Sequence, residues 1–114
     1  MTLREIGELL DCEILACEDA LDRDITEVVA SDGMSEVLAY TKSGELMVTG
    51  LTNIQSIRTA DIAGVAGVVY CRGKRPVATA IDYAREKGIP VLATRLVMFD
   101  VCGLLYNAGL KGIS

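Results

Sequence analysis

Apolar runs and segments of helical periodicity alternate along the chain from residue 46 onward. The apolar runs are short and are bounded by glycine, proline or polar residues, which is typical of buried strands. Between them, apolar residues recur every three or four positions, as in helices that cover a sheet. The pattern predicts strands over 46–49, 65–70 and 89–93 and helices over 54–63, 76–87 and 96–108. This alternation with short connections predicts a parallel sheet between two helical layers.

Residues 1–45 are more polar and predict shorter elements. Thr2 and Glu5 form a capping box ahead of an apolar stripe, which predicts a short N-terminal helix. The remaining elements are predicted as strands over 12–16 and 25–30 and a helix over 34–40. Asp32 or the serine before it can cap that helix, whose Val37 and Leu38 are expected to face inward. The direction of the first strand stays open.

The predicted fold class is α/β, for one domain over residues 1–114. We expect three layers, α/β/α, with a mostly parallel sheet of four to five strands. The run from Leu46 to Thr49 ends in a glycine turn, after which Thr52 or Asn53 can cap the next helix. Such a turn presents backbone N–H groups and the positive end of a helix dipole at the carboxyl edge of the sheet. Open α/β sheets bind ligands at this edge.

Basic residues collect in the segments after predicted strands, at positions 23, 72, 74, 75 and 95. They are therefore expected to gather along one edge of the sheet. Lys74, Arg75 and Arg95 lie at or just before helix N-termini, where the helix dipole disfavours a cation by roughly a few tenths of a kcal/mol. A bound anion would offset that cost, which favours a site for a phosphate-bearing or carboxylate ligand. The alternative is a set of separate, solvated loop charges.

The expected ligand site combines these basic loops with the glycine turn. Its residues are Asp22, Arg23, Thr49, Gly50, Thr52, Asn53, Arg72, Gly73 and Arg95. Asp22 and Arg23 could instead belong to a self-paired turn with Asp24, and the spacing alone favours that turn. Asp32 is expected to cap a helix and not to act as a base.

Composition narrows the classes of partner. The net charge of −5 disfavours non-specific binding to nucleic acid or to an anionic membrane. The longest run without a charged residue, 46–57, is shorter than the roughly 20 residues that a membrane-spanning helix needs. Charged residues among the first eleven positions exclude the apolar core of a signal peptide. We therefore expect a cytoplasmic protein.

Residue types that carry catalysis or hold a metal are sparse. The chain has no histidine, and Cys12, Cys17, Cys71 and Cys102 form no close-spaced pair, so neither a metal nor another cofactor is expected. The cysteines fit small buried hydrophobes, except that Arg72 could stabilise a thiolate at Cys71. No phosphate-binding fingerprint of a kinase or NTPase occurs. We do not expect an enzyme, and a small enzyme that uses Cys71 or an aspartate is the least favoured alternative.

The predicted helix over 96–108 is apolar on nearly all sides, and Asp100 is its only charged residue. A helix that covers a sheet in a monomer normally has a polar face. The second apolar face predicts a contact with another subunit, so we expect a homodimer through the C-terminal helix. The alternative is that the N-terminal helix alone covers this face.

With the elements placed, the order and spacing of several short segments resemble the DRTGG domain family across residues 6–109. These segments are Leu21–Thr26, Ser31–Asp32, Leu51–Asn53, Ala60–Ala63, Gly73 with Pro76, Gly88–Thr94, and Leu104–Tyr106 with Gly109. The letters of the family name are dispersed in this chain. The resemblance implies a three-layer fold similar to the N-terminal domain of HPr kinase/phosphorylase. It implies no kinase activity, because the phosphate loop of that kinase lies in a different domain.

DRTGG domains also occur fused to CBS pairs and pyrophosphatases, so the resemblance implies a regulatory or dimerising role. Together with the basic loops, it favours a module that senses a small anionic ligand such as an adenine nucleotide. A protein–protein adaptor or scaffold without a small-molecule ligand is the alternative. Some stand-alone members are encoded near iron hydrogenase and electron-transfer genes, which implies a redox or energy-metabolism protein as a partner.

Overall fold

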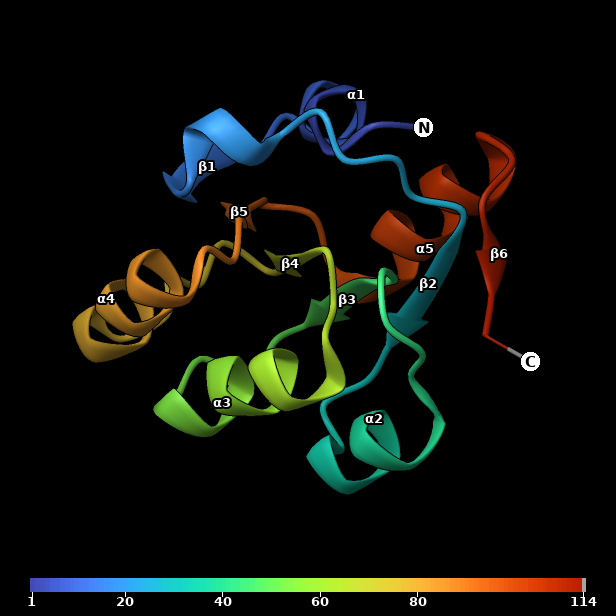
Figure 1. Cartoon of the computed structure of the whole chain (residues 1–114). Coiled ribbons are helices and arrows are strands. Elements are labelled where there is room, and N and C mark those ends of the chain that lie inside the picture. The colour runs from blue at the N-terminus through green and yellow to red at the C-terminus, as the bar shows by residue number, and fades with distance from the viewer. Residues whose placement is uncertain (114) are drawn as a thin grey trace.

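The computed structural model describes residues 1–113 and shows one sheet with helices on both faces (Figure 1). Within that range, six strands lie in the order β1-β5-β4-β3-β2-β6. The strands are β1 (Glu13–Ala16), β2 (Glu27–Ala30), β3 (Leu46–Thr49), β4 (Gly67–Tyr70), β5 (Val91–Ala93) and β6 (Lys111–Gly112). The helices are α1 (Leu3–Leu9), α2 (Met34–Tyr40), α3 (Ile54–Ala63), α4 (Ala78–Lys87) and α5 (Met98–Asn107), with a 3-10 turn, Glu18–Ala20, after β1.

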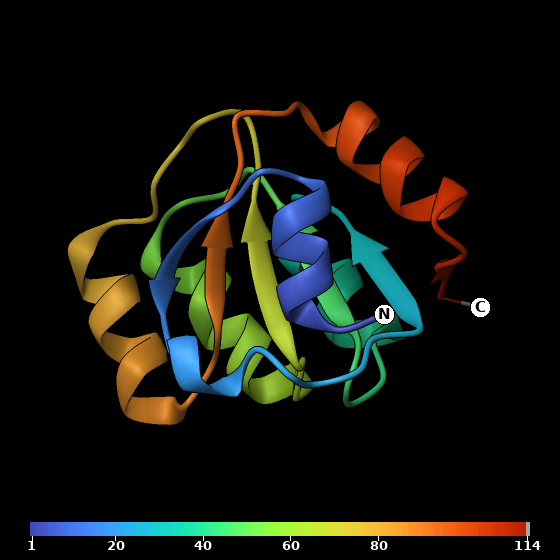
Figure 2. The same cartoon turned by 90° about the horizontal axis from the view of Figure 1, so that it is seen from above.

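Buried side chains form two clusters, one on each face of the sheet. Leu46 and Val48 of β3 belong to the cluster that holds the buried residues of α1 and α5. Met47, between them, belongs to the cluster of α2, α3 and α4. Successive strand residues point to opposite faces, so an uninterrupted apolar strand serves both clusters. Figure 2 shows α1 in front of the sheet and α3 behind it. The predicted three-layer α/β/α class is confirmed.

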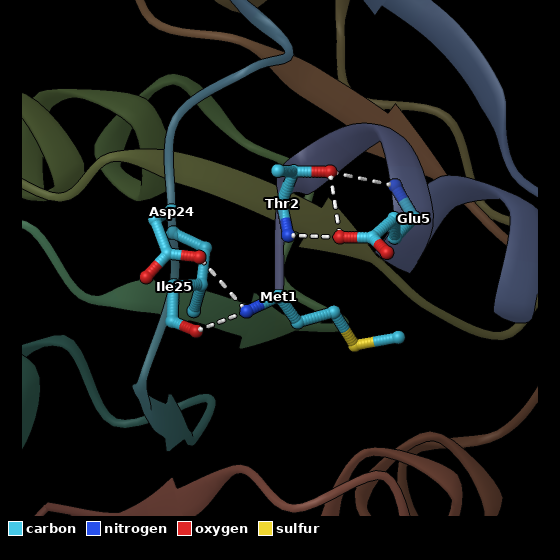
Figure 3. A network of polar contacts seen from close by, with 5 residues as sticks. All are labelled: Met1, Thr2, Glu5, Asp24 and Ile25. Carbon is cyan, nitrogen blue, oxygen red and sulfur yellow. Dashed lines mark hydrogen bonds and ion pairs between the residues drawn. The ribbon is translucent and has the colours of Figure 1, made fainter.

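The capping box at the start of α1 is present as predicted. The Thr2 hydroxyl accepts the Glu5 N–H at 3.2 Å, and the Glu5 carboxylate accepts the Thr2 N–H at 2.9 Å. The amino group of Met1 donates to Asp24 Oδ1 at 2.9 Å and to the Ile25 carbonyl at 3.2 Å (Figure 3). These contacts fasten the segment that leads into β2 to the start of α1.

All strands of the sheet run in the same direction except β1, at one edge. β2, β3, β4 and β5 are parallel, and β6 is parallel to β2. β1 is antiparallel to β5, with Glu13 opposite Ala93. The start of β1 therefore lies at the carboxyl edge of the parallel strands, and its end lies at their amino edge. β6 was not predicted, because two residues such as Lys111 and Gly112 carry no periodic pattern, so the sheet has one strand more than the expected four to five.

The connections after β4 and β5 leave the sheet toward opposite faces. α4 follows β4 and contributes to the same cluster as α2 and α3. α5 follows β5 and contributes to the cluster of α1. In open α/β sheets, such a change of direction opens a crevice at the carboxyl ends of the strands. The loops 71–77 and 94–97 flank this point.

α4 and α5 begin later than predicted. The Val77 N–H donates to the Thr52 carbonyl at 3.0 Å, and Val77 has extended backbone angles. That contact keeps Pro76 outside the helix, and α4 begins at Ala78. α5 begins at Met98, two residues after the predicted start.

α2 has the predicted range without the predicted cap. Gly33 is its N-cap residue and no side chain caps the helix, because Asp32 bonds elsewhere. Val37 is fully buried, whereas Leu38 is 44% exposed, so the expectation that both face inward is wrong for Leu38. Consecutive helical residues point about 100° apart, and a short helix buries one narrow stripe.

Candidate functional site

The glycine turn after β3 holds a carboxylate of the protein itself. Oδ1 of Asp32 accepts the Gly50 N–H at 2.7 Å and the Thr49 hydroxyl at 2.9 Å. The bond from Gly50 lowers the pKa of Asp32 below its ordinary value, and the Thr49 hydroxyl and the charge of Arg72 act in the same direction. Asp32 is therefore ionised at neutral pH. The Gly50 amide that was expected to be available to a ligand is already satisfied from within the chain.

Arg72 lies over the same turn. A methyl group at Gly50 would be 3.4 Å from Nη2 of Arg72 and 3.6 Å from Oδ1 of Asp32, so the absent side chain leaves room for both groups. Arg72 and Gly73 both have left-handed backbone angles, with φ of 66° and 70°. A non-glycine residue in this conformation is uncommon, and it directs the chain sharply away from β4.

The start of α3 is fixed beside this turn by buried and partly buried hydrogen bonds. Tyr70 Oη and Ser56 Oγ are 2.8 Å apart, and Ser56 Oγ donates to the Asn53 carbonyl at 2.7 Å. The Asn53 side chain accepts the Ser56 N–H at 3.3 Å, which confirms Asn53 as the cap. The side-chain oxygen of Asn53 is therefore used to cap the helix. The Thr52 carbonyl accepts the Val77 N–H at 3.0 Å.

Two backbone hydrogen bonds join the loops where α4 and α5 diverge. The Arg72 N–H donates to the Leu96 carbonyl at 2.7 Å, and the Gly73 N–H donates to the Thr94 carbonyl at 2.9 Å. The buried hydroxyl of Thr94 donates to the Leu10 carbonyl at 2.7 Å. The two loops are therefore held together and anchored to the end of α1.

A cleft of about 260 Å³ opens beside these joined loops. Its lining residues are Asp11, Glu13, Gly73, Arg75, Ala93, Thr94 and Arg95. Nη1 of Arg75 forms an ion pair with Oε1 of Glu13, and both side chains are more than half exposed. Arg95 is exposed and has no ion-pair partner within residues 1–113. The cleft thus contains one paired and one unpaired guanidinium group.

The structure brings most of the predicted site residues to the carboxyl edge and excludes two of them. Arg23 donates to the Ala66 carbonyl at 3.0 Å and to the Gly88 carbonyl at 3.2 Å, at the starts of β4 and β5. Asp22 pairs with Arg4 at 3.2 Å. The prediction that Asp22 and Arg23 join the other residues is wrong, because the antiparallel β1 delivers the chain to the amino edge.

Sequence reasoning missed the acidic side of the cleft. Asp11 and Glu13 precede and open β1, and their place at the carboxyl edge follows from the direction of that strand. Two carboxylates at the start of a predicted strand were visible in the sequence, but the strand's direction was not. The role of Asp32 was also missed, because a cap and a tertiary acceptor have the same local sequence signature.

The environment of Cys71 does not activate its thiol. Burial raises the pKa of Cys71, and the charge of Asp32 raises it further, against the lowering by Arg72. The expectation that Arg72 stabilises a thiolate there is wrong. Burial likewise raises the pKa of Cys12 to about 12.

α5 exposes an apolar face. Phe99 is 84% and Tyr106 74% exposed, whereas Val101 and Leu105 are buried against the sheet. The alternative in which α1 alone covers the second face is therefore wrong. A hollow of about 380 Å³, which was not predicted, follows the outer edge of β2 between α2 and α5. In the part of the chain that the structure describes, no helix is both long and apolar enough to cross a bilayer.

A three-layer α/β domain with a charged cleft at the divergence of its crossovers is the class that the fold and site define. The chain belongs to the DRTGG domain family, whose model matches residues 5–108. This confirms the family inferred from the dispersed segments. No curated protein matches the chain.

Among solved structures, the chain is similar to the CBS and DRTGG domains of the regulatory region of Clostridium perfringens pyrophosphatase, complexed with its activator diadenosine tetraphosphate. The TM-score is 0.78 at 18% identity, over 91% of this chain and 45% of that chain. At this identity the likeness shows a shared fold. The chain spans less than half the length of that regulatory structure.

Proposed function

We propose that this chain is a cytoplasmic regulatory module that senses a small anionic ligand, such as an adenine nucleotide, and dimerises through α5. The observation that carries the ligand-sensing role is the cleft beside Gly73, where Arg75 and Arg95 face a common space at the divergence of the crossovers. The adenine-nucleotide class is supported by the similar pyrophosphatase region, whose structure holds diadenosine tetraphosphate.

Arg95 is the residue best placed to hold the anion. Its guanidinium group is exposed at the cleft and has no competing carboxylate among the ion pairs of residues 1–113. A guanidinium group binds phosphate through two parallel N–H donors, which gives both affinity and orientation. Arg75 becomes a second donor when it exchanges Glu13 for the ligand. The charge of Arg72, by contrast, already acts on the carboxylate of Asp32, although the two side chains form no ion pair among residues 1–113.

The connection between the cleft and α5 supports a regulatory role. Residues 94–97 line or adjoin the cleft and lead directly into α5. Phe99 and Tyr106, seven residues apart on one face of that helix, are 84% and 74% exposed, and such a face fits a symmetric interface. A ligand at the cleft therefore contacts the segment that positions the proposed dimer interface.

The proposal includes no catalytic step. The Cys71 thiol is buried and its pKa is raised, and the Asp32 carboxylate is already engaged with Gly50 and Thr49. These groups are therefore poor candidates for a nucleophile or a base.

Calorimetry with AMP, ATP, diadenosine polyphosphates and acetyl phosphate tests ligand sensing. We expect at least one adenine nucleotide to bind, and Arg95→Ala to weaken it. Arg58→Ala, which removes an exposed arginine from α3, is the matched control and is expected to leave binding unchanged. No heat change with any compound at millimolar concentration would leave dimerisation as the only remaining role.

Sedimentation of the purified chain at micromolar concentration tests dimerisation. We expect a dimer that Phe99→Asp dissociates. Ile62→Asp is the control, because Ile62 is also an exposed large apolar residue, 74% exposed, but lies on α3. A wild-type monomer at this concentration contradicts the dimer.

The second candidate function is an adaptor that binds another protein, of the redox or energy-metabolism class that the family resemblance implies. The exposed α5 face and the apolar hollow beside it favour this role over an enzyme. Leu104→Asp is expected to abolish capture of such a partner, whereas Arg72→Ala is not. The reverse result would favour the ligand-binding edge as the functional surface.

A further inference from the structure

The cleft beside Gly73 is not built as a simple anion site. Asp11 and Glu13 line it together with Arg75 and Arg95, so its formal side-chain charges cancel. A site for an inorganic anion needs hydrogen-bond donors and is weakened by carboxylates. Two carboxylates on the wall of a cleft instead suit a ligand that carries hydrogen-bond donors as well as an anionic group.

We infer that this cleft binds the ribose phosphate part of a nucleotide, with the arginines on the phosphate and Glu13, aided by Asp11, on the ribose hydroxyls. The inference rests on the proposed function and deepens it, because it names the part of the ligand that is recognised. A vicinal diol offers two O–H donors, and a carboxylate accepts both. Carboxylates at the carboxyl edge of α/β sheets bind ribose hydroxyls in dinucleotide-binding folds by this chemistry.

The direction of β1 makes the arrangement possible. Glu13 lies opposite Ala93 in the ladder, so the acidic start of β1 stands next to the end of β5 and its Arg95 loop. Glu13 and Arg95 therefore come from neighbouring strands of opposite direction. A parallel strand in this place would have carried the carboxylates to the amino edge.

The size of the cleft limits what it can enclose. Its volume of about 260 Å³ lies just below the range of roughly 300–1,000 Å³ that encloses a whole small-molecule ligand. A sugar with one phosphate fits this space, and the base then extends outside. The preference for adenine must come from contacts beyond the cleft, while the ribose and phosphate set the class of ligand.

In the free protein, Arg75 and Glu13 form an ion pair with each other that a ligand must replace. The two side chains are 56% and 62% exposed, so their mutual attraction is screened by water and is readily exchanged for a ligand. When a nucleotide enters, Arg75 turns to the phosphate and Glu13 to the diol. Each charged group thus exchanges one partner for another.

Binding of AMP and of 2′,3′-dideoxy-AMP to the same protein isolates the diol. Both ligands carry the same phosphate and base, so their affinity ratio is insensitive to any general change of charge. We expect wild-type protein to prefer AMP by about tenfold, which corresponds to about 1.4 kcal/mol for the charge-assisted hydrogen bonds. Inorganic pyrophosphate is the ribose-free reference ligand.

Variants at position 13 test the residue. Glu13→Ala is expected to bring the AMP preference close to one while pyrophosphate binding is kept or strengthened. Glu13→Gln keeps a neutral acceptor and is expected to retain part of the preference. Glu18→Ala removes an exposed glutamate beyond the other end of β1 and is expected to leave the ratio unchanged.

The outcomes separate this inference from the proposed function. Equal binding of AMP and dideoxy-AMP by wild-type protein overturns the ribose assignment and leaves anion sensing intact. A preference that survives Glu13→Ala also overturns it, because the diol is then recognised elsewhere. An absence of binding by every ligand, pyrophosphate included, refutes the proposed function itself and this inference with it.

Discussion

The turn at Gly50 and the cleft beside Gly73 contain similar groups, but a carboxylate of the chain binds the glycine amide only at Gly50. Each combines a glycine after a parallel strand with a nearby arginine at the carboxyl edge of the sheet. At Gly50, the carboxylate of Asp32 accepts the amide and the neighbouring hydroxyl, and Arg72 lies near it without forming an ion pair. At the cleft, the Gly73 amide donates to the Thr94 carbonyl and not to a carboxylate, and Arg95 forms no ion pair among residues 1–113.

The difference separates a structural anion from a ligand site. Donors at the carboxyl edge of a sheet attract a negative charge whether it comes from a ligand or from the chain. Where a side chain supplies the charge, the turn is stabilised and closed. Where an arginine has no ion-pair partner, as Arg95 has none within residues 1–113, an anionic ligand can supply one. The four predictions below test this distinction, beginning with the largest expected effect.

Asp32→Ala removes the internal anion. We expect the free energy of unfolding to fall by about 2 kcal/mol, because the partly buried Gly50 amide loses its charged acceptor. Urea unfolding measures the loss. Sulfate is expected to stabilise this variant more than wild-type protein, since the amide becomes available to an external anion. Asp22→Ala, which breaks an exposed pair with Arg4, is the control and is expected to change stability by less than about 0.5 kcal/mol.

The same difference between wild-type protein and Asp32→Ala is expected to depend on pH. Folding lowers the pKa of Asp32 below its ordinary value of 3.8, so its contribution is present in full above that value. The contribution is lost as the pH falls through the lower pKa of the folded state. Unfolding curves of both proteins between neutral and strongly acidic pH measure the difference. A gap that is constant down to the lowest pH contradicts the ionised carboxylate.

Arg95→Ala and Arg72→Ala compare the two arginines directly. We expect Arg95→Ala to weaken binding of the best adenine nucleotide about tenfold, or about 1.4 kcal/mol. Arg72→Ala is expected to have a smaller effect, because its charge is already near Asp32. Calorimetry with one ligand and three proteins gives both values. A larger effect of Arg72→Ala would transfer the ligand site to the Gly50 turn.

Arg23→Ala extends the comparison to the amino edge of the sheet. Its guanidinium group donates to two backbone carbonyls, so its loss is expected to lower the free energy of unfolding by about 1 kcal/mol. Ligand affinity is expected to stay at the wild-type value. If the variant folds normally but loses ligand affinity, Arg23 belongs to the binding site after all.

The sequence predicted residues 46–108 well because the strands there are uninterrupted apolar runs and the helices are long enough to show their period. The strand over 46–49 and the helix over 54–63 have the predicted bounds, and Asn53 caps that helix. The start of α4 shifted because one tertiary contact, from Val77 to the Thr52 carbonyl, overrode the local preference of Pro76. β6 is too short for any pattern to mark it.

The candidate site was predicted only where strand direction was known. Arg72, Gly73 and Arg95 follow strands whose parallel direction follows from the strand–helix alternation, and they lie together at the carboxyl edge. Arg23 and Glu13 flank β1, whose direction depends on which neighbour it pairs with and not on its own residues. Because this direction was not determined, the prediction placed Asp22 and Arg23 in the site and missed Asp11 and Glu13.

The short segment 94–97 between β5 and α5 has a thermodynamic consequence. It adjoins the cleft on one side and leads into the exposed apolar helix on the other. If a nucleotide binds more tightly to the paired subunits than to the single one, linkage requires each bound nucleotide to strengthen pairing by the same factor. Apparent nucleotide affinity would then rise with protein concentration, and the chain would report cellular ligand level through its own state of association.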